Sequence, residues 1–220
     1  MKKYTAHGLL SLPLLMGALS LAEAHVTFVA NNAYAGKSYV ATLNTFHGCE
    51  DANATEYDTV KIEVTIPAGF TAVRPADATF GPASVEKDTN GNVTKLIWTK
   101  TAPALTEDAN FQQVTFRGTL PNEALTTLTF PTTQTCAGDT TKTWIGADAP
   151  KLRVLSVRTP GWNKYTAQQN IDEATLKAFF TDAHIVWSSG AAYSINPEIM
   201  KLVTNPLTAI PQGGVYWVKY

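Results

Sequence analysis

A histidine stands directly after a small-x-small triplet (AEA, residues 22–24) near the start of this 220-residue chain. A dilysine start and an apolar run over residues 9–21 precede that triplet, and the whole pattern is typical of a secretory signal peptide. Cleavage after Ala24 would make His25 the first residue of an exported chain. The α-amine and the imidazole Nδ1 of His25 could then close one chelate ring on a single metal ion.

This pair of nitrogen donors indicates copper. Cu(II) has the highest affinity of the common divalent ions for such sites and accepts tetragonal N/O geometry. The α-amine must lose its proton to bind, and a reference pKa of about 8 makes that accessible. We therefore predict one Cu(II) ion per chain, held by His25 as a brace. Two alternatives stay open: histidine, at 4 of 220 residues, stands there by chance, or the cut falls two residues earlier, after Ala22.

A second set of candidate ligands surrounds the first cysteine, in the stretch FHGCED over residues 46–51. It contains one imidazole, His47, and two carboxylates, Glu50 and Asp51. The chain has two cysteines, Cys49 and Cys136, and in an oxidising compartment two cysteines predict one disulfide. Binding of metal by the two thiols is the alternative.

If the two cysteines pair, their Cα atoms lie within about 7 Å of each other. His47 and the stretch 134–144, which ends at Trp144, would then be near neighbours. Trp98 and Trp144 could each be a core residue or the neighbour of a bound metal. His184 has no ligand-type neighbour in the sequence, and we expect it to be structural.

Composition sets the class of protein. Removing residues 1–24 leaves 196 residues with 17 − 2 = 15 basic and 18 − 1 = 17 acidic side chains. That balance gives no reason to expect nucleic acid or anionic lipid as a partner. A hydrophobic fraction of 45% is enough for a proper core, and no second apolar run could span a membrane in the mature chain. We expect a periplasmic or secreted bacterial protein.

The elements that must position these residues are mostly strands. Residues 59–66 (TVKIEVTI) alternate between apolar and polar side chains, which is typical of a half-buried strand, and Asn90-Gly91 is a strong hairpin signal. Further strands are expected over residues 37–46, 70–74, 93–99, 110–120, 125–130, 143–145 and 152–157. Many short strands with frequent turn signals predict a mainly β protein, an antiparallel β-sandwich.

The chain changes character after about residue 158. Residues 171–182 have helical spacing, capped by Asn170 or Asp172, and residues 197–203 could form a short second helix. Strand-like stretches follow at 183–187 and 215–220. We therefore expect three parts: a signal peptide over 1–24, the sandwich over 25–157, and a small α/β appendage over 158–220 that packs on the sandwich.

Several stretches taken in order resemble the YcnI-like family of exported copper-binding domains. They are AHVTFVAN, FHGCEDANAT followed by VKIEVTIP, FQQVTFRGTLP, FPTTQTCAG and the segment 143–150. The resemblance covers about residues 25–157 and implies an immunoglobulin-like β-sandwich with one Cu(II) ion on an N-terminal histidine brace. Carried over, His25 is the brace and Trp144 is the tryptophan close to the metal. The C-terminal part resembles extensions of proteobacterial members and has no assigned role.

The chain departs from the family pattern at the further ligand. Family members often use an acidic residue near the end of the second strand, where this chain has FHGCE over 46–50. His47 takes the aligned place and Glu50 and Asp51 follow, so the choice between His47, Glu50 and Asp51 stays open.

Three function classes follow from these residues. The first is a copper-binding or copper-trafficking protein that passes the ion to another periplasmic or membrane copper protein. The second is an enzyme, a copper monooxygenase that cleaves polysaccharides, with His47 as the second histidine of its site. The third is a surface adhesion sandwich in which His25 is accidental. No G-x-S-x-G, H-E-x-x-H or P-loop motif supports hydrolase or nucleotide chemistry.

Overall fold

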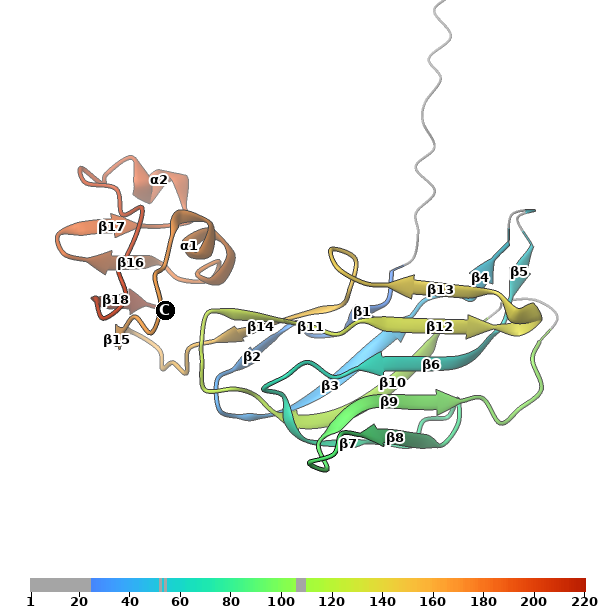
Figure 1. Cartoon of the computed structure of the whole chain (residues 1–220). Helices are drawn as coiled ribbons and strands as arrows, with labels where there is room; N and C mark the ends of the chain where they lie inside the picture. The colour runs from blue at the N-terminus through green and yellow to red at the C-terminus, as the bar shows by residue number, and fades with distance from the viewer. Residues whose placement is uncertain (1–24, 52, 54, 106–109) are drawn as a thin grey trace, which may run out of the picture.

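The computed structural model describes residues 25–220 except 52, 54 and 106–109. The predicted signal peptide, residues 1–24, lies outside the described residues. Figure 1 shows a β-sandwich that carries most of the strands and a smaller C-terminal unit beside it. None of the described helices is long and apolar enough to cross a membrane.

Two antiparallel sheets form the two layers of the sandwich (Figure 1). The first has the order β1-β3-β10-β7, with bounds Thr27–Phe28, Ser38–Thr45, Gln112–Thr119 and Thr71–Pro75. The second has the order β13-β12-β6-β9-β8, with bounds Thr141–Trp144, Thr132–Cys136, Thr59–Thr65, Val93–Thr99 and Ala83–Lys87. Alternating side chains of both sheets are buried between them, as expected for a sandwich.

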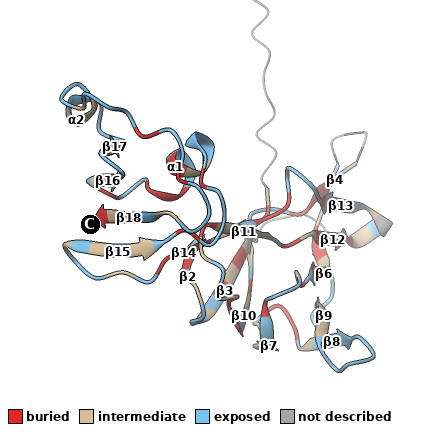
Figure 2. Cartoon of the chain, turned by 60° about the vertical axis from the view of Figure 1, so that its left-hand side comes forward, coloured by how far each residue is buried: buried red, intermediate tan, exposed pale blue. Residues whose placement is uncertain are grey.

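Phe130 is at the centre of the sandwich core. Its ring centroid lies 5.1 Å from that of Phe28, 5.5 Å from that of Phe70 and 5.9 Å from that of Phe116. Phe28 and Phe116 come from the first sheet, whereas Phe70 and Phe130 come from connecting segments, and their edge-to-face and tilted contacts add to the hydrophobic burial. Figure 2 shows the buried residues along the facing strands.

Two smaller sheets extend the sandwich at its ends. One has the order β11-β14-β2, with bounds Thr126–Thr129, Lys151–Leu155 and Asn32–Tyr34. Its β14–β2 pair is parallel, whereas the other ladders are antiparallel. The other is the hairpin of β4 (Cys49–Glu50) and β5 (Glu56–Tyr57). A 3₁₀ turn, Ala137–Asp139, joins β12 to β13.

The C-terminal unit packs two short helices on one antiparallel sheet. The sheet has the order β15-β18-β16-β17, with bounds Trp162–Thr166, Val215–Lys219, Ile185–Ser188 and Ala191–Tyr193. The helices are α1, Glu173–Phe179, and α2, Pro197–Met200. The carboxylate of Asp172 accepts a hydrogen bond of 2.7 Å from the amide of Thr175, which confirms the predicted N-cap.

The C-terminal unit has a hydrophobic core of its own that reaches into the sandwich. Leu125 precedes β11 and Leu155 is the last residue of β14. Both are buried together with Leu176, Phe180 and Ile210 of the C-terminal unit. The guanidinium of Arg153 donates to the carbonyl of Ala178 at 2.8 Å, and further polar contacts join the two parts. The appendage is thus in direct contact with the sandwich.

Arg158 is the main polar link at this junction. Its guanidinium forms a 2.5 Å ion pair with Asp182 and lies 4.3 Å from the ring centroid of Tyr220 and 5.7 Å from that of Tyr34. The hydrogen bond from Arg158 holds the pKa of Asp182 below its usual value, and burial raises the pKa of Tyr220. Arg158 therefore links Tyr34, on β2 of the sandwich, to Asp182 and Tyr220 of the C-terminal unit.

Replacing Arg158 by alanine is expected to destabilise the protein by about 1–2 kcal/mol, because two cation–π contacts and a half-exposed ion pair are lost together. Thermal unfolding followed by circular dichroism measures the loss, with the exposed Arg117→Ala as the matched control. The folded-state pKa of Asp182 is depressed, so the contribution of the pair is present above the ordinary carboxyl pKa of 3.8 and disappears as pH falls through the lower folded-state value. A stability loss in Arg158→Ala equal to that in Arg117→Ala would contradict this role.

The structure confirms most of the predicted elements, including the β8–β9 hairpin at Asn90-Gly91. There the carboxylate of Asp88 accepts from the amides of Asn90 and Asn92, and Gly91 takes a positive φ of 82° that its type allows. The predicted helices are shorter than expected, and β12 was missed altogether. Its sequence, TTQTC, has no apolar alternation because the inward side chains are Thr132, Gln134 and Cys136.

Candidate metal centre

The backbone around His25 is held by the side chains that follow it. Val26 is 1% exposed and Phe28 is also buried in the sandwich core, while β1 pairs with β3 so that Thr27 faces Asn44. His25 directly precedes this anchored segment. The His25 side chain is 43% exposed, which leaves it accessible to an ion from solvent.

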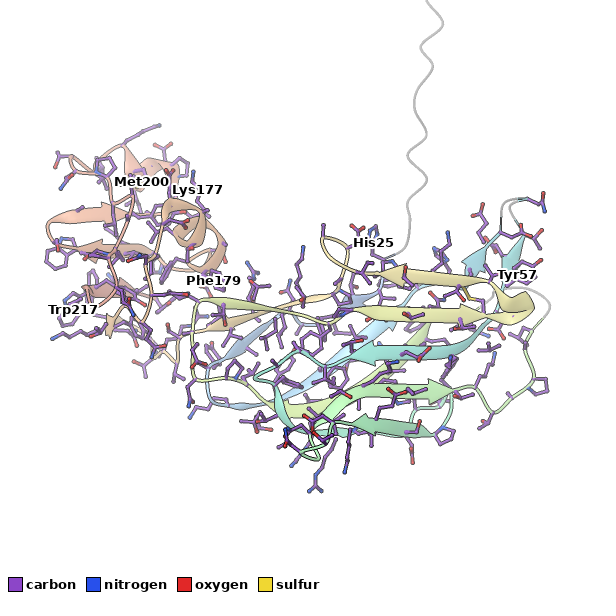
Figure 3. The ribbon with its side chains drawn as sticks, viewed as in Figure 1. His25, Tyr57, Lys177, Phe179, Met200 and Trp217 are labelled. Atoms are coloured by element: carbon purple, nitrogen blue, oxygen red, sulfur yellow. A yellow bond between two sulfur atoms is a disulfide. The ribbon has the colours of Figure 1, made fainter. Side chains whose placement is uncertain are left out.

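The turn after β13 lies beside His25 (Figure 3), and it carries the carboxylate of Asp148. Nε2 of His25 lies 3.9 Å from Oδ1 of Asp148. The amide of Asp148 donates to the carbonyl of Ile145 at 3.1 Å, and the ammonium of Lys151 donates to the carbonyl of Ala147 at 2.7 Å. These two bonds fix the turn that carries Asp148. Sequence reasoning did not single out Asp148, although it stands only four residues after Trp144.

Trp144 ends the strand that leads into the same turn. It is 8% exposed and belongs to the same buried cluster as Val26, the neighbour of His25. Trp98 is fully buried, and its indole N–H donates to the carbonyl of Ala76 at 2.9 Å. Trp98 is therefore a core residue, whereas Trp144 is a buried residue at the end of β13, four positions before Asp148. The role of Trp144 as the neighbour of a metal stays a prediction.

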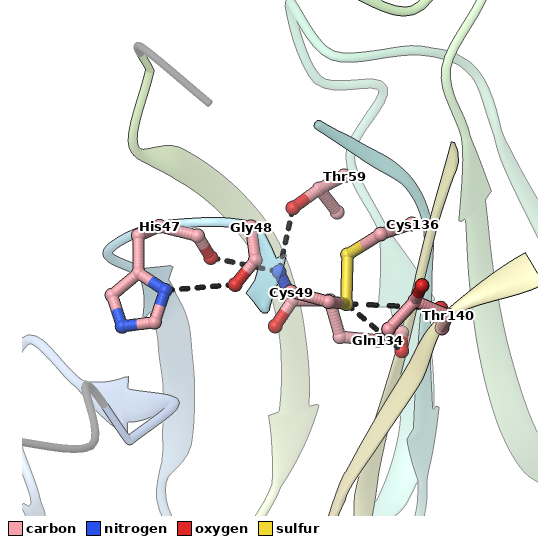
Figure 4. The surroundings of a disulfide bond; sticks show 7 residues. All are labelled: His47, Gly48, Cys49, Thr59, Gln134, Cys136 and Thr140. Carbon is pink, nitrogen blue, oxygen red and sulfur yellow. Dashed lines mark hydrogen bonds between the residues drawn. A yellow bond between two sulfur atoms is a disulfide. The ribbon is translucent and has the colours of Figure 1, made fainter. Parts of the chain in front are cut away.

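His47 lies at the end of β3, in the segment that leads to the disulfide (Figure 4). Its Nδ1 is 2.7 Å from the carbonyl oxygen of Gly48, and its own carbonyl accepts a 2.8 Å hydrogen bond from the side-chain amide of Gln134. The same Gln134 nitrogen also donates to the hydroxyl of Thr59 at 2.6 Å. Gln134 is 1% exposed, so a buried amide fixes the backbone of His47.

The two acidic candidates beyond His47 belong to the β4–β5 hairpin. Glu50 is exposed at the end of β4, and its backbone pairs with that of Glu56 on β5. The carboxylate of Asp51 accepts from the amide of Thr55 at 2.9 Å and from the hydroxyl of Tyr57 at 3.2 Å. The backbone hydrogen bond from Thr55 is the main reason why the pKa of Asp51 is lowered. Asp51 therefore closes the hairpin turn.

The predicted ligand set is not gathered in the structure. Within the described part of the chain, no three histidine, cysteine, aspartate or glutamate side chains lie close enough to hold one metal ion. His25, His47 and Glu50 therefore do not form a three-residue cluster. The side-chain partner that the structure adds to His25 is Asp148.

The predicted disulfide is confirmed. Cys49 and Cys136 are bonded, with 5.8 Å between their Cα atoms, and both are buried. The bond joins the start of the β4–β5 hairpin to the end of β12, across 87 positions of sequence. It therefore anchors the segment that carries His47 to the strand that carries Gln134.

Most of the chain matches one known protein family. Residues 25–161 match the family described as domain of unknown function DUF1775, which is more than half of the 220 residues. The chain belongs to this family. The DUF1775 match begins at His25, and the family description names no ligand. No curated protein matches the chain.

The DUF1775 domain is similar in fold to an uncharacterized protein from Nocardia farcinica whose crystal structure reveals an immunoglobulin-like fold. The two share 23% sequence identity with a TM-score of 0.50, over 60% of this chain and 99% of that one. This likeness confirms the expected immunoglobulin-like sandwich, and at that identity it concerns the fold alone. A cohesin module from a Clostridium perfringens family 33 glycoside hydrolase has 13% identity and a TM-score of 0.37, over 60% of this chain and 97% of that module. That score is too low to carry an argument.

Proposed function

We propose that the chain is an exported Cu(II)-binding protein that holds its ion at His25 and acts in bacterial periplasmic copper trafficking or homeostasis. The observation that carries the proposal is the placement of His25. Buried Val26 anchors the backbone beside it, while the half-exposed imidazole faces Asp148 at 3.9 Å. The start of the DUF1775 match at His25 and the resemblance to YcnI-like domains support the same residue.

The chemistry of the donors fits Cu(II) as cargo. After cleavage at Ala24, His25 would offer an α-amine and Nδ1, two nitrogens of the type that Cu(II) prefers. A carboxylate beside Nε2 favours the tautomer that carries its proton on Nε2, and that tautomer leaves the Nδ1 lone pair to the metal. Asp148 is thus proposed as a positioning residue. His47, Glu50 and Asp51 remain predicted further ligands.

Equilibrium dialysis of the exported chain against Cu(II) and Zn(II) tests this function. We expect one Cu(II) ion per chain, and weaker retention of Zn(II), because Cu(II) exceeds Zn(II) in affinity for nitrogen donors. Absence of bound Cu(II) would reject the proposal. The alternative of a polysaccharide monooxygenase, with His47 as a second ligand, stays a prediction.

Replacing Asp148 by asparagine is expected to weaken Cu(II) binding severalfold. Loss of a hydrogen-bond partner of a metal-bound histidine typically lowers metal affinity about 10- to 100-fold. Because the His25–Asp148 pair is exposed and 3.9 Å apart, its loss should lower the affinity by about tenfold or less. Competition titration with a copper chelator measures the change. The control is Glu123→Gln, which removes the same charge from an exposed site, and equal affinities in the two variants would contradict the role of Asp148.

A further inference from the structure

Three tryptophans share one face of the C-terminal sheet. Trp187 on β16 pairs directly with Trp217 on β18, and Trp162 on β15 pairs with Lys219, two residues along β18 from Trp217. Side chains two apart on a strand lie on the same face, so the three indoles occupy three adjacent strands of one surface. Figure 3 labels Trp217 on this unit, apart from His25 on the sandwich.

The opposite face of this sheet is already used by the core. Val186, Tyr216 and Val218 are buried in the same cluster as Leu176 of α1, whereas Trp162 is 53% exposed and Trp187 is 43% exposed. Trp162, Trp187 and Trp217 line an open pocket of about 410 Å³. Aromatic surface of this extent outside the core is therefore not needed to hold the unit together, and exposed patches of this kind mark binding sites.

The charged side chains that β15, β18 and β16 place on this face are basic. Lys164 pairs with Trp217 across β15 and β18, and its ammonium lies 5.6 Å from the centroid of the Trp217 ring. Lys219 is the other charged side chain of the face and is exposed. Strands β15, β18 and β16, all of whose residues are described, contain no aspartate or glutamate. The face thus combines flat aromatic rings with positive charge.

We propose that this tryptophan face, formed by Trp162, Trp187 and Trp217 with Lys164 and Lys219, binds an anionic glycan. The C–H bonds on one side of a sugar ring carry partial positive charge and pack against the negative face of an indole. Carboxylate or sulfate groups on the same polymer pair with the two lysines. The surface would hold the exported protein on acidic polysaccharide outside the cytoplasm, a property separate from copper binding.

The size of the face favours a glycan over a second copy of the chain. Each tryptophan has about 250 Å² of surface at most, so three half-exposed rings offer on the order of 300–400 Å². A stable dimer buries about 800 Å² on each partner. The tryptophan face is too small for that, whereas it matches the length of a few sugar rings.

The position of the rings favours a glycan over a membrane. β18 and β16 are inner strands of the sheet, so Trp217 and Trp187 lie within a flat surface and not at the tip of a loop. Residues that enter a bilayer must reach about 5–10 Å below its surface, which protruding segments do. A flat ladder of rings is suited to stacking along an extended chain.

Affinity electrophoresis in native gels tests the proposal, with alginate, polygalacturonate or heparin as the anionic glycan and dextran as the neutral one. We expect retardation by at least one anionic polymer and not by dextran. The variants Trp187→Ala and Trp162→Ala should each weaken that interaction about tenfold. Trp187→Phe should retain part of it, and Lys164→Gln with Lys219→Gln should weaken it and reduce its salt dependence.

The matched control is Phe111→Ala, which removes an exposed aromatic side chain, 57% accessible, from the sandwich. Unfolding midpoints of all variants confirm that the core on the other face is intact. Failure of all three anionic glycans to retard the protein would overturn the proposal, as would equal retardation by dextran. Tryptophan-dependent binding to phosphatidylglycerol vesicles without glycan binding, or a dimer that Trp187→Ala dissociates, would overturn it in favour of those partners.

Discussion

Replacing His25 by alanine is expected to abolish tight Cu(II) binding by the exported chain. The variant keeps the α-amine but loses the imidazole, so the chelate ring cannot close. The affinity should fall by more than the roughly 10- to 100-fold that loss of an outer partner costs, since His25 itself is the proposed ligand. Val26 and Phe28 hold the backbone in either case, so the fold should be unaffected.

Chelator competition measures this affinity, and His184→Ala is the matched control. The amide of His184 donates to the carbonyl of Lys219 in the C-terminal unit, so its side chain belongs to a different part of the molecule. We expect His184→Ala to bind Cu(II) as the parent does. Unchanged affinity in His25→Ala would move the site to other residues, of which His47 is the first to test by His47→Ala.

The second large effect is expected from removing the disulfide. A disulfide that closes a loop of 87 positions stabilises the folded state by about 4.5 kcal/mol in the chain-entropy model. The free energy of unfolding of native proteins is about 5–15 kcal/mol in total. The double variant Cys49→Ser with Cys136→Ser should therefore lose a large share of its stability. The double variant is the informative one because it leaves no lone thiol.

Urea unfolding followed by circular dichroism measures this loss. The parent protein in reductant should unfold at the same lower urea concentration as the double variant, and the double variant should not respond to reductant. The His47 segment should become mobile with it, since Gln134 and the disulfide hold that segment on β12. A midpoint of the double variant equal to that of the oxidised parent would show that the bond adds no stability.

The strands and the disulfide could be predicted because their signals are local. Residues 59–66 alternate with period two and the structure forms β6 there, and the two cysteines of the chain leave one intramolecular pairing. β12 could not be predicted in this way, because its buried side chains are threonine, glutamine and cysteine. Gln134 is buried because it satisfies the carbonyl of His47 and the hydroxyl of Thr59, and both partners are distant in sequence.

One residue of the candidate site could likewise be predicted from local sequence, and another could not. His25 could be singled out from the triplet before it, but Asp148 reaches it only through the pairing of β1 with β3 and of β13 with β12. Glu50 stands three residues after His47 in sequence, yet the hairpin of β4 and β5 takes it into a separate element. Closeness in sequence thus did not gather the predicted ligands into one cluster among the described residues, while closeness in space supplied a partner of His25.

The most direct test of copper binding at the N-terminus compares two forms of the exported protein by Cu(II) electron paramagnetic resonance. One form begins at His25 and the other has a single additional alanine before it, which converts the α-amine into an amide. If the α-amine is a ligand, the first form shows nitrogen hyperfine structure from one tightly bound Cu(II), and the second form lacks it. Identical spectra and stoichiometry in both forms would show that the α-amine is no ligand and would contradict the brace.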